Sequence, residues 1–508
     1  MNQRCDLLVI GGGINGVGIA RDAAGRGLSV ILCEKDDLAA HTSSASSKLI
    51  HGGLRYLEHY EFALVRKALL EREVLMRVAP HLISPLNFVM PYVSGLRPYF
   101  VLRAGLFLYD HLAKRSLLAG SKSLDFASHE SGACLQSHLE RGFQYSDAWV
   151  DDARLVVLNA VDAQERGATI LTRTLCDSMY AHQGRWRVQL TKTDIGANHQ
   201  IEVDAACIVN ATGAWAAQFQ ARIEGRDATK KLRLVKGSHI VVKRLFEHHS
   251  AYIFQHPDGR IVFAIPYENA FTLIGTTDLE YHGGLDDLRI STEEIEYLCD
   301  LSNQYFKQQI SPAEVIHSYS GVRPLVDDGS LDAKSVTRDY QLELVNEGAP
   351  ILNVFGGKIT TYRRLAEDAL DLIISHMNNQ AGAWTAEACL PGGDIFLAQA
   401  SNQNVRDFPK FIQECRARYP WLTSHQVNRM ARAYGSRIHQ VLHECVSEHA
   451  MGEQVLPGLY ACEIHYLRTM EFAKSAQDIL WRRTKLGLHL SKDSERILDN
   501  WLAKRPLF

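Results

Sequence analysis

Residues 6–34 read DLLVIGGGINGVGIARDAAGRGLSVILCE, and this stretch decides the fold. The pattern predicts a strand over residues 6–10, a glycine turn, a helix over residues 14–26 and a second strand over residues 29–34. Gly27 follows the helix, where glycine commonly ends one. The stretch therefore predicts a complete βαβ unit.

The turn of this unit carries glycines with the spacing G-x-G-x-x-G, at Gly11, Gly13 and Gly16. Glycine suits these positions because the backbone must come close to a pyrophosphate, which the free N–H groups of the helix N-terminus bind. Glu34 ends the second strand, where an acid binds the adenosine ribose. The alternative is a tight turn in an unrelated α/β protein. A dinucleotide site is favoured because strand, helix and acid all fall in place.

Length and composition limit the remaining classes. The 508 residues exceed the size of a single core, so two or three domains are expected. The 55 basic and 58 acidic residues balance, which indicates no nucleic-acid partner. Ten single cysteines without a C-x-x-C pair argue against metal sites and disulfide frameworks. We expect a cytoplasmic protein, because the chain starts without a signal-peptide pattern and shows no apolar window of about 18 residues.

Two later segments return to the nucleotide-binding unit. Residues 203–215, VDAACIVNATGAW, predict a strand that ends in a small turn. Residues 351–373, ILNVFGGKITTYRRLAEDALDLI, predict a strand, a Gly-Gly turn and an amphipathic helix. Between them, residues 251–278 predict antiparallel strands joined by Pro-Asp-Gly and Glu-Asn turns. We therefore expect an α/β fold in which a Rossmann-like domain holds an inserted antiparallel-sheet substrate domain.

The chain beyond residue 390 predicts a separate domain. Leu390-Pro391-Gly392-Gly393 is typical of a linker, and the pattern is helical almost to the end. We expect an all-α C-terminal domain over residues 391–508. The first 390 residues are expected to interleave a cofactor domain, mainly residues 1–95, 140–220 and 335–390, with a substrate domain, mainly residues 96–139 and 221–334.

These later segments favour a flavin over a nicotinamide cofactor. A flavin needs a turn beside its ribityl chain, which VNATGAW supplies. It also needs a helix N-terminus near the pyrimidine side of the ring, where negative charge develops on reduction. FGGKITTY predicts such a helix start.

The stretch TSSASSKLIHGGLR, residues 42–55, completes the predicted cofactor site. Its hydroxyl groups can bind phosphate or ribityl oxygens, and its glycine pair lets the backbone lie against the flat ring. The residues expected to bind the cofactor are Gly11, Gly13, Ile14, Asn15, Gly16, Glu34, Lys35, Thr42, Ser43, Ser44, Ser47, Leu49, His51, Gly52, Gly53, Ala211, Thr212, Gly213, Gly357, Lys358, Ile359 and Thr360.

Residues 9–62, together with YSGVRPL and VFGGKITTYRRLAE, closely resemble the aerobic FAD-dependent glycerol-3-phosphate dehydrogenases. RGFQYSDAWVDDARLV and LIGTTDLEY extend the resemblance over nearly the whole chain. The resemblance implies the glutathione-reductase-like FAD superfamily, in the branch of the D-amino acid oxidases, and non-covalent FAD. Ala214 departs from the proline of the family's ATGPW, so the turn there is expected to be less rigid.

The resemblance also implies the reaction, one step of aerobic glycerol metabolism. Hydride passes from C2 of sn-glycerol 3-phosphate to flavin N5, giving dihydroxyacetone phosphate, and the electrons go to membrane quinone. A dianionic phosphate favours arginine, whose planar fork binds oxygens in pairs. Arg55 and Arg323 are the candidates. The resemblance implies that both face the substrate pocket, with Tyr56 beside Arg55; the alternative is a surface arginine in a salt bridge.

Loss of the substrate hydroxyl proton requires a base, or a charge that stabilises the alkoxide. His239 in KGSHIVV and Lys358 in FGGKITT are candidates for these roles. The alternatives are a core histidine and a solvent-exposed lysine. Arg338 in VTRDY is a further basic candidate near the pocket.

Delivery of electrons to quinone implies attachment to the cytoplasmic face of the inner membrane. Residues 95–122, GLRPYFVLRAGLFLYDHLAKRSLLAGSK, combine bulky apolar and basic side chains. They predict an element that lies on an anionic lipid surface; the alternative is a helix packed in the protein core. The helical C-terminal domain offers a surface for a homodimer without requiring one.

Other functions remain open at this stage. An oxidase would pass the electrons to dioxygen. An amine or amino acid oxidase of the same superfamily would bind a carboxylate with one arginine and need no second basic group. A flavin-binding sensor would show no turnover. Covalent attachment at His51 is a further alternative to non-covalent FAD.

Overall fold

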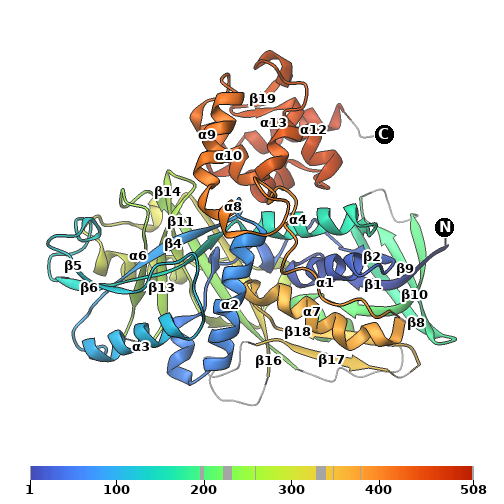
Figure 1. Ribbon diagram of the computed structural model, residues 1–508, viewed down its shortest axis with the longest axis horizontal. Helices are drawn as coiled ribbons and strands as arrows, with labels where there is room; N and C mark the ends of the chain where they lie inside the picture. Colours follow the sequence, from blue (N-terminus) through green and yellow to red (C-terminus); the bar gives the residue numbers. More distant parts are fainter. Residues whose placement is uncertain are drawn as a thin grey trace.

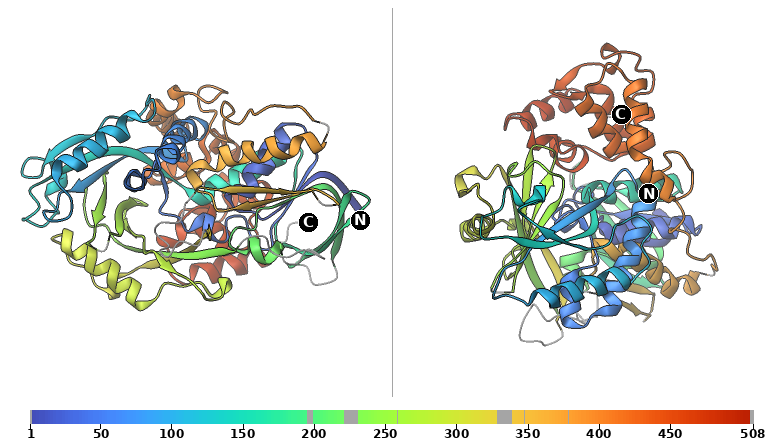
Figure 2. Two further views of the ribbon diagram at one scale, coloured as in Figure 1. Left: turned by 90° about the horizontal axis from the view of Figure 1, so that it is seen from below. Right: turned by 60° about the vertical axis from the view of Figure 1, so that its left-hand side comes forward.

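The computed structural model describes residues 2–194, 199–220, 231–257, 259–327, 339–346, 348–377 and 379–505. Arg338, one of the predicted basic residues, lies outside the described residues. Two sheets form the body of the molecule, and the C-terminal domain stands on top of them (Figures 1 and 2).

The first sheet has eight strands and contains the predicted βαβ unit. Its main order is β17-β18-β10-β1-β2-β7, and the β8–β9 hairpin is attached to β10. The strands β1, β2, β7, β10 and β18 are parallel, while β17 runs antiparallel at the edge. Its strands are β1 (Asn2–Ile10), β2 (Val30–Cys33), β7 (Thr169–Leu171), β8 (Thr174–His182), β9 (Arg185–Lys192), β10 (Gln200–Asn210), β17 (Gln341–Val345) and β18 (Ile351–Phe355).

Helices α1 (Ile14–Gly25), α4 (Asp152–Glu165) and α7 (Tyr362–Ile373) pack together against this sheet. Leu7, Leu8 and Val9 in β1 are fully buried, as expected for a parallel strand that is covered on both faces. Gly27 follows α1 with a φ of +85°, so the predicted helix end is confirmed.

The second sheet has ten strands, in the order β15-β11-β14-β13-β12-β4-β6-β3, with β16 paired to β11 and β5 paired to β6. All pairs are antiparallel except β4 with β12. Its strands are β3 (Leu49–Ile50), β4 (Ile83–Pro91), β5 (Lys122–Asp125), β6 (Arg141–Val150), β11 (Leu232–Lys243), β12 (Ala251–Gln255), β13 (Ile261–Tyr267), β14 (Phe271–Gly275), β15 (Leu279–Glu280) and β16 (His317–Val326).

The two sheets interleave more than the sequence analysis expected. Strands β4 and β6 fall within residues 1–95 and 140–220, which were assigned to the cofactor domain, but they pair in the second sheet. The reason is that β4 takes its partners from β6 and β12, which are distant in sequence. The other helices of the body are α2 (Phe62–Val78), α3 (Tyr99–His111), α5 (Ala216–Gln220) and α6 (Thr292–Tyr305).

The C-terminal domain is helical, as predicted, with one short hairpin that the sequence analysis missed. Its elements are α8 (Asn402–Arg406), α9 (Phe408–Arg418), α10 (Ser424–Tyr434), α11 (Ile438–Val441), α12 (Ala461–Met470), α13 (Ser494–Ala503), β19 (Gln454–Leu456) and β20 (Leu459–Tyr460). None of the helices that the structure describes is both long and apolar enough to cross a lipid bilayer.

Candidate active site

The glycine turn packs too tightly for a side chain at Gly11 or Gly16. A Cβ atom on Gly16 would lie 1.9 Å from the carbonyl oxygen of Gly11. A Cβ atom on Gly11, whose φ is +114°, would lie 2.5 Å from the carbonyl oxygen of Ala211. The turn, the N-terminus of α1 and the end of β10 therefore meet at backbone distance, as a pyrophosphate-binding turn requires.

One end of the site is a cavity of about 350 Å³ beside the end of β2. Glu34 lines it, and its carboxylate accepts hydrogen bonds from the N–H groups of Gly12, at 2.6 Å, and Asp36, at 2.9 Å. Burial raises the pKa of Glu34, while the two backbone donors oppose this shift. Lys35 and Thr212 also line this cavity, which fits the adenosine part of a dinucleotide.

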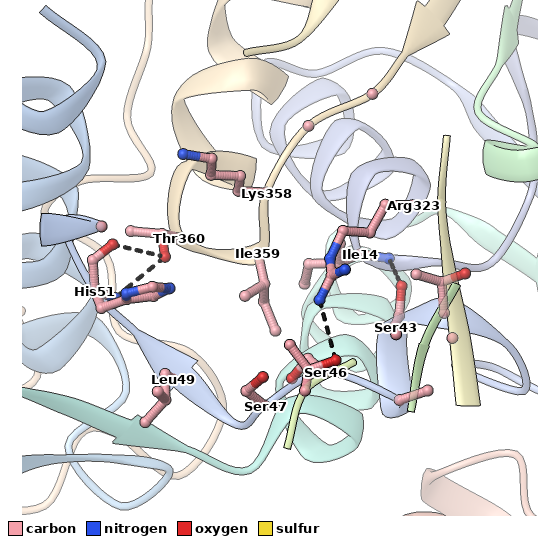
Figure 3. Close-up of a pocket in the computed structure, with 18 of the residues that line it drawn as sticks. Ile14, Ser43, Ser46, Ser47, Leu49, His51, Arg323, Lys358, Ile359 and Thr360 are labelled. Carbon is pink, nitrogen blue, oxygen red and sulfur yellow. Dashed lines mark hydrogen bonds between the residues drawn. The ribbon is translucent and has the colours of Figure 1, made fainter. Parts of the chain in front are cut away.

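A second cavity, of about 330 Å³, adjoins the first, since several residues line both. The segment 43–51 runs along one side of it, Lys358 and Ile359 also border it, and Thr360 lies beside His51 at the end of that segment (Figure 3). The predicted site residues that line this cavity are Gly13, Ile14, Asn15, Thr42, Ser43, Ser47, Leu49, His51, Gly53, Arg55, Tyr56, Ala211, Gly213, Arg323, Gly357, Lys358, Ile359 and Thr360.

The residues of this cavity fit the ribityl and ring portions of FAD. Ser43 Oγ accepts a hydrogen bond from the N–H of Ile14 at 3.0 Å, and Asn15 Nδ2 donates to the carbonyl of Gly356 at 3.1 Å. Asn15 Oδ1 is buried and has no hydrogen-bond partner within the described ranges, so it is available to a ligand. Thr360 Oγ1 meets both backbone groups of His51, at 3.3 and 3.4 Å. These contacts hold the segments from three parts of the chain around one space.

Two predicted cofactor residues point elsewhere. The hydroxyl of Ser44 donates to the carbonyl of His41 at 3.2 Å, because the short 3-10 turn Thr42–Ser44 rotates it away from the cavity. Gly52 is buried against Leu69 and Tyr109, and its N–H donates to the Tyr109 hydroxyl at 2.9 Å. Ser44 and Gly52 line neither of the two cavities, and their contacts with the cofactor stay predictions.

Three of the predicted cationic side chains, from three parts of the chain, line the second cavity. Arg55 lies in the 3-10 helix Leu54–His59 and has no ion-pair partner among the residues that the structure describes. The Nη1 atom of Arg323, on β16, lies 3.2 Å from an Asp278 carboxylate oxygen. The Nζ atom of Lys358 lies 3.7 Å from the ring centre of Tyr56, a cation–π contact.

The structure adds two residues that the sequence analysis missed. Asp278 follows β14 and orients Arg323. Arg260 lines the same cavity and lies 3.9 Å from the ring centre of Tyr297. Asp278 stands in the LIGTTD segment, which was a usable signal; nothing local to Arg260 in the sequence indicates its position.

Both predicted histidines, His51 and His239, are neutral near pH 7. Burial, with Lys358 nearby, lowers the pKa of His51 to about 4. Burial lowers the pKa of His239 well below its usual value, and Lys48 and Arg323 add to the shift. His239 is 1% exposed and does not line the cavity. Its Nε2 atom lies 2.8 Å from Ser47 Oγ, which does line it, so the structure does not support direct contact of His239 with a substrate.

Two protein families match this chain. The family described as FAD dependent oxidoreductase matches residues 6–363, and the C-terminal domain of alpha-glycerophosphate oxidase matches residues 383–503. Among solved structures, the glycerol-3-phosphate dehydrogenase from Bacillus halodurans complexed with FAD has a TM-score of 0.78 at 27% identity. The match covers 99% of this chain and 90% of the Bacillus halodurans chain.

Curated relatives match over almost their full length. A glycerol-3-phosphate dehydrogenase of Pseudomonas aeruginosa is 50% identical over 499 residues, which is 98% of this chain and 94% of the relative. The aerobic glycerol-3-phosphate dehydrogenase of Escherichia coli is 46% identical, over 98% of this chain and 97% of the relative. A D-erythritol 1-phosphate dehydrogenase of Brucella abortus is also 46% identical, over 99% of both chains. The chain therefore belongs to the glycerol-3-phosphate dehydrogenase family of FAD-dependent oxidoreductases, and FAD is its cofactor.

Proposed function

We propose that this enzyme oxidises sn-glycerol 3-phosphate to dihydroxyacetone phosphate and passes the electrons to membrane quinone. The observation that carries the proposal is the convergence of Arg55, Arg323 and Lys358 on one cavity beside the FAD-binding segments. A phosphate dianion needs more than one cation to offset the loss of its water, and arginine binds its oxygens in pairs. An amino acid carboxylate would need only one guanidinium.

Each cation has a part in this proposal. Bound FAD supplies the acceptor for the hydride that leaves C2 of the substrate. Arg55 and Arg323 hold the phosphate, and Asp278 fixes the orientation of Arg323. Lys358 stabilises the negative charge on the C2 oxygen as the hydroxyl proton passes to solvent water, and the contact with Tyr56 keeps the ammonium group in the cavity. Non-covalent FAD is part of the proposal.

We further propose that α3 attaches the protein to the cytoplasmic face of the membrane. Only Leu106 and Tyr109 of this helix are buried, which contradicts the core-helix alternative. Phe100 is 72% exposed and Phe107 is 57% exposed. The 3-10 helix Leu54–His59 contacts α3, and Tyr60, which directly follows that 3-10 helix, is 80% exposed. Such an exposed apolar face, with basic side chains in the same segment, suits the interface of an anionic bilayer.

Anaerobic mixing with candidate substrates tests the reaction. The purified enzyme with FAD is mixed with sn-glycerol 3-phosphate, and its visible flavin absorbance is recorded. We expect fast bleaching, and recovery of colour when a soluble quinone is added. No bleaching with this substrate in an enzyme that is visibly yellow contradicts the substrate assignment. Oxygen uptake during turnover without quinone favours an oxidase.

A second candidate substrate is D-erythritol 1-phosphate, because the relative from Brucella abortus matches this chain end to end. The two substrates share the phosphate and a secondary alcohol, and the second is longer by one CHOH unit. Their kcat/KM values, measured side by side with a D-amino acid as negative control, decide between them. A ratio of tenfold or more in favour of the four-carbon substrate, about 1.4 kcal/mol, would reassign the substrate.

A further inference from the structure

Ser47 is connected to a buried histidine that faces it from the second sheet. Its hydroxyl lines the cavity, and Ser47 Oγ lies 2.8 Å from the Nε2 atom of His239 in β11. This is a contact between residues 192 positions apart in the chain. Ser47 and His239 therefore form a polar pair at the cavity wall, and neither of them is one of the proposed phosphate-binding groups.

The ring of His239 is held from both faces. On one side it stacks on Tyr319, with ring centres 4.9 Å apart and planes at 21°. On the other side Gly275 leaves room for the ring, since a Cβ atom there would lie 2.1 Å from His239 Cδ2. The Tyr319 hydroxyl donates to the carbonyl of Ser46 at 2.9 Å, which ties the backbone before Ser47 to β16. The histidine and the serine therefore have a fixed relative position.

The surroundings determine which nitrogen of His239 carries its proton. The ring is neutral, because it is buried beside Lys48 and Arg323. Its Nδ1 atom has no hydrogen-bond partner among the described residues. A buried N–H group without a partner is rarer in proteins than an unused lone pair, so the proton belongs on Nε2. The Nε2–H group then donates to Ser47 Oγ.

We infer that Ser47 is a catalytic hydrogen-bond donor and that His239 is its positioning residue. With the Ser47 oxygen occupied by the imidazole N–H, the hydroxyl hydrogen is free to point into the cavity. There it donates to an electron-rich atom at the reacting centre, on the C2 oxygen of the substrate or on the flavin. No bond to Ser47 or His239 forms or breaks, so His239 is not the base. The inference rests on the proposed function for the identity of the substrate.

Four variants test this pair, using whichever substrate bleaches the wild-type enzyme. These are Ser47→Ala, His239→Leu, the double variant and His239→Gln. We expect Ser47→Ala and His239→Leu each to lower kcat about 10- to 100-fold with KM changed less than threefold, as for a lost hydrogen bond to developing charge. The kcat of the double variant should be no lower than that of the less active single variant, because both substitutions remove the same interaction. His239→Gln, whose amide can still donate, should keep most of the activity.

The pH dependence separates a positioning role from a base. If His239 were the base, His239→Gln would lose activity and its kcat/KM profile would lose the acid limb. We expect the acid limb of the kcat/KM profile to be the same in His239→Gln and in the wild type. FAD content and melting temperature are measured for all variants. His317→Gln is the control, because His317 lies on β16 and does not line the second cavity. If His239→Leu does not fold, Ser47→Ala and His239→Gln carry the test.

The flavin spectrum without substrate tells which atom accepts the hydrogen bond. A shifted absorbance band or reduction potential in Ser47→Ala places the acceptor on the flavin. An unchanged spectrum with reduced kcat places it on the substrate, and both results support the inference. A kcat within twofold of the wild type in Ser47→Ala, or effects of the two single variants that add, would overturn it. Failure of the wild type to bleach would instead reject the proposed function.

Discussion

Gly16 shows how a single methyl group would disturb the cofactor site. Its Cβ atom would lie 1.9 Å from the carbonyl oxygen of Gly11, in a turn that has no flexible atom to move. We expect Gly16→Ala to lose most of its bound FAD, measured as the ratio of visible flavin to protein absorbance. Gly105→Ala is the matched control, because a methyl there meets no atom within 4 Å in the described part of the chain. Normal FAD content in Gly16→Ala would refute the tight turn.

Arg323 offers a second prediction at this scale. Removal of its guanidinium from the cavity should lower kcat/KM by about 100-fold or more, since a charge-assisted bidentate contact contributes about 3 kcal/mol. Steady-state kinetics of Arg323→Ala test this. Arg323→Lys keeps the positive charge but lacks the planar guanidinium, so its kcat/KM should lie between those of the wild type and Arg323→Ala. An unchanged kcat/KM in Arg323→Ala would remove Arg323 from the substrate site.

His81 predicts a pH dependence of stability. It is fully buried, and both ring nitrogens lack partners within the described ranges. Burial lowers the pKa of His81 from 6.5 to about 3 in the folded protein. Between about pH 3 and pH 6.5, His81 therefore binds a proton in the unfolded chain but not in the folded protein. The free energy of unfolding should therefore fall as pH falls below 6.5, by about 2 kcal/mol between pH 7 and pH 5.

Urea unfolding of His81→Phe at both pH values measures this contribution. The variant keeps a planar ring but cannot titrate, so we expect a stability difference between the two pH values that is about 2 kcal/mol smaller than in the wild type. His443→Phe is the control, because the His443 side chain is 77% exposed. Equal pH dependence in His81→Phe and the wild type would contradict the prediction.

At the scale of elements, local patterns predicted some units and missed others. The βαβ unit was predictable because α1, its glycine turn and the flanking strands depend on residues close in sequence. The sheet membership of β4 and β6 was not, because each of them takes partners from distant strands. The exposure of α3 was also left open, since its apolar residues alone do not distinguish a core helix from a surface helix.

Helix α3 carries the prediction about the membrane. It lies at the end of the molecule opposite the C-terminal domain (Figures 1 and 2). Phe100→Asp with Phe107→Asp should reduce sedimentation with anionic lipid vesicles at least tenfold, because two exposed aromatic groups are replaced by charges that anionic lipid repels. Activity with a soluble quinone should stay unchanged. Val446→Asp, at a residue 80% exposed on the C-terminal domain, is the control. Full vesicle binding by the double variant would place the attachment elsewhere.

At the scale of the whole molecule, buried charges connect the C-terminal domain to the cofactor domain. Arg154 in α4 pairs with Glu471, and both side chains are fully buried. Arg154 also donates to the carbonyl of Ala433 at 2.7 Å. The pairing with Glu471 raises the pKa of Arg154, against the effect of its burial. Arginine is effectively always protonated in proteins, so the Arg154 charge persists when its partner is removed. The pair therefore couples the stability of the two domains.

Glu471→Gln tests this coupling. The variant leaves a buried guanidinium without a counter-charge, and we expect a loss of about 3–5 kcal/mol in the free energy of unfolding. The pair Arg496–Asp493 is about 70% exposed on both sides, and Asp493→Asn should cost less than about 1 kcal/mol. Calorimetry of both variants measures the difference. A loss below 1 kcal/mol in Glu471→Gln would show that the domains do not depend on this contact.

The sequence by itself determined the βαβ unit, the flavin cofactor and the family, because these depend on short patterns whose geometry is local. It also named Arg55, Arg323 and Lys358 as candidates. Only the tertiary structure decided that these cations share one cavity, that Ser44 turns away from it and that Arg260 and Asp278 join it. The physical reason is that the direction of a side chain depends on how strands far apart in the chain pair and pack. The position of His239 behind Ser47 follows from that packing and from no local pattern.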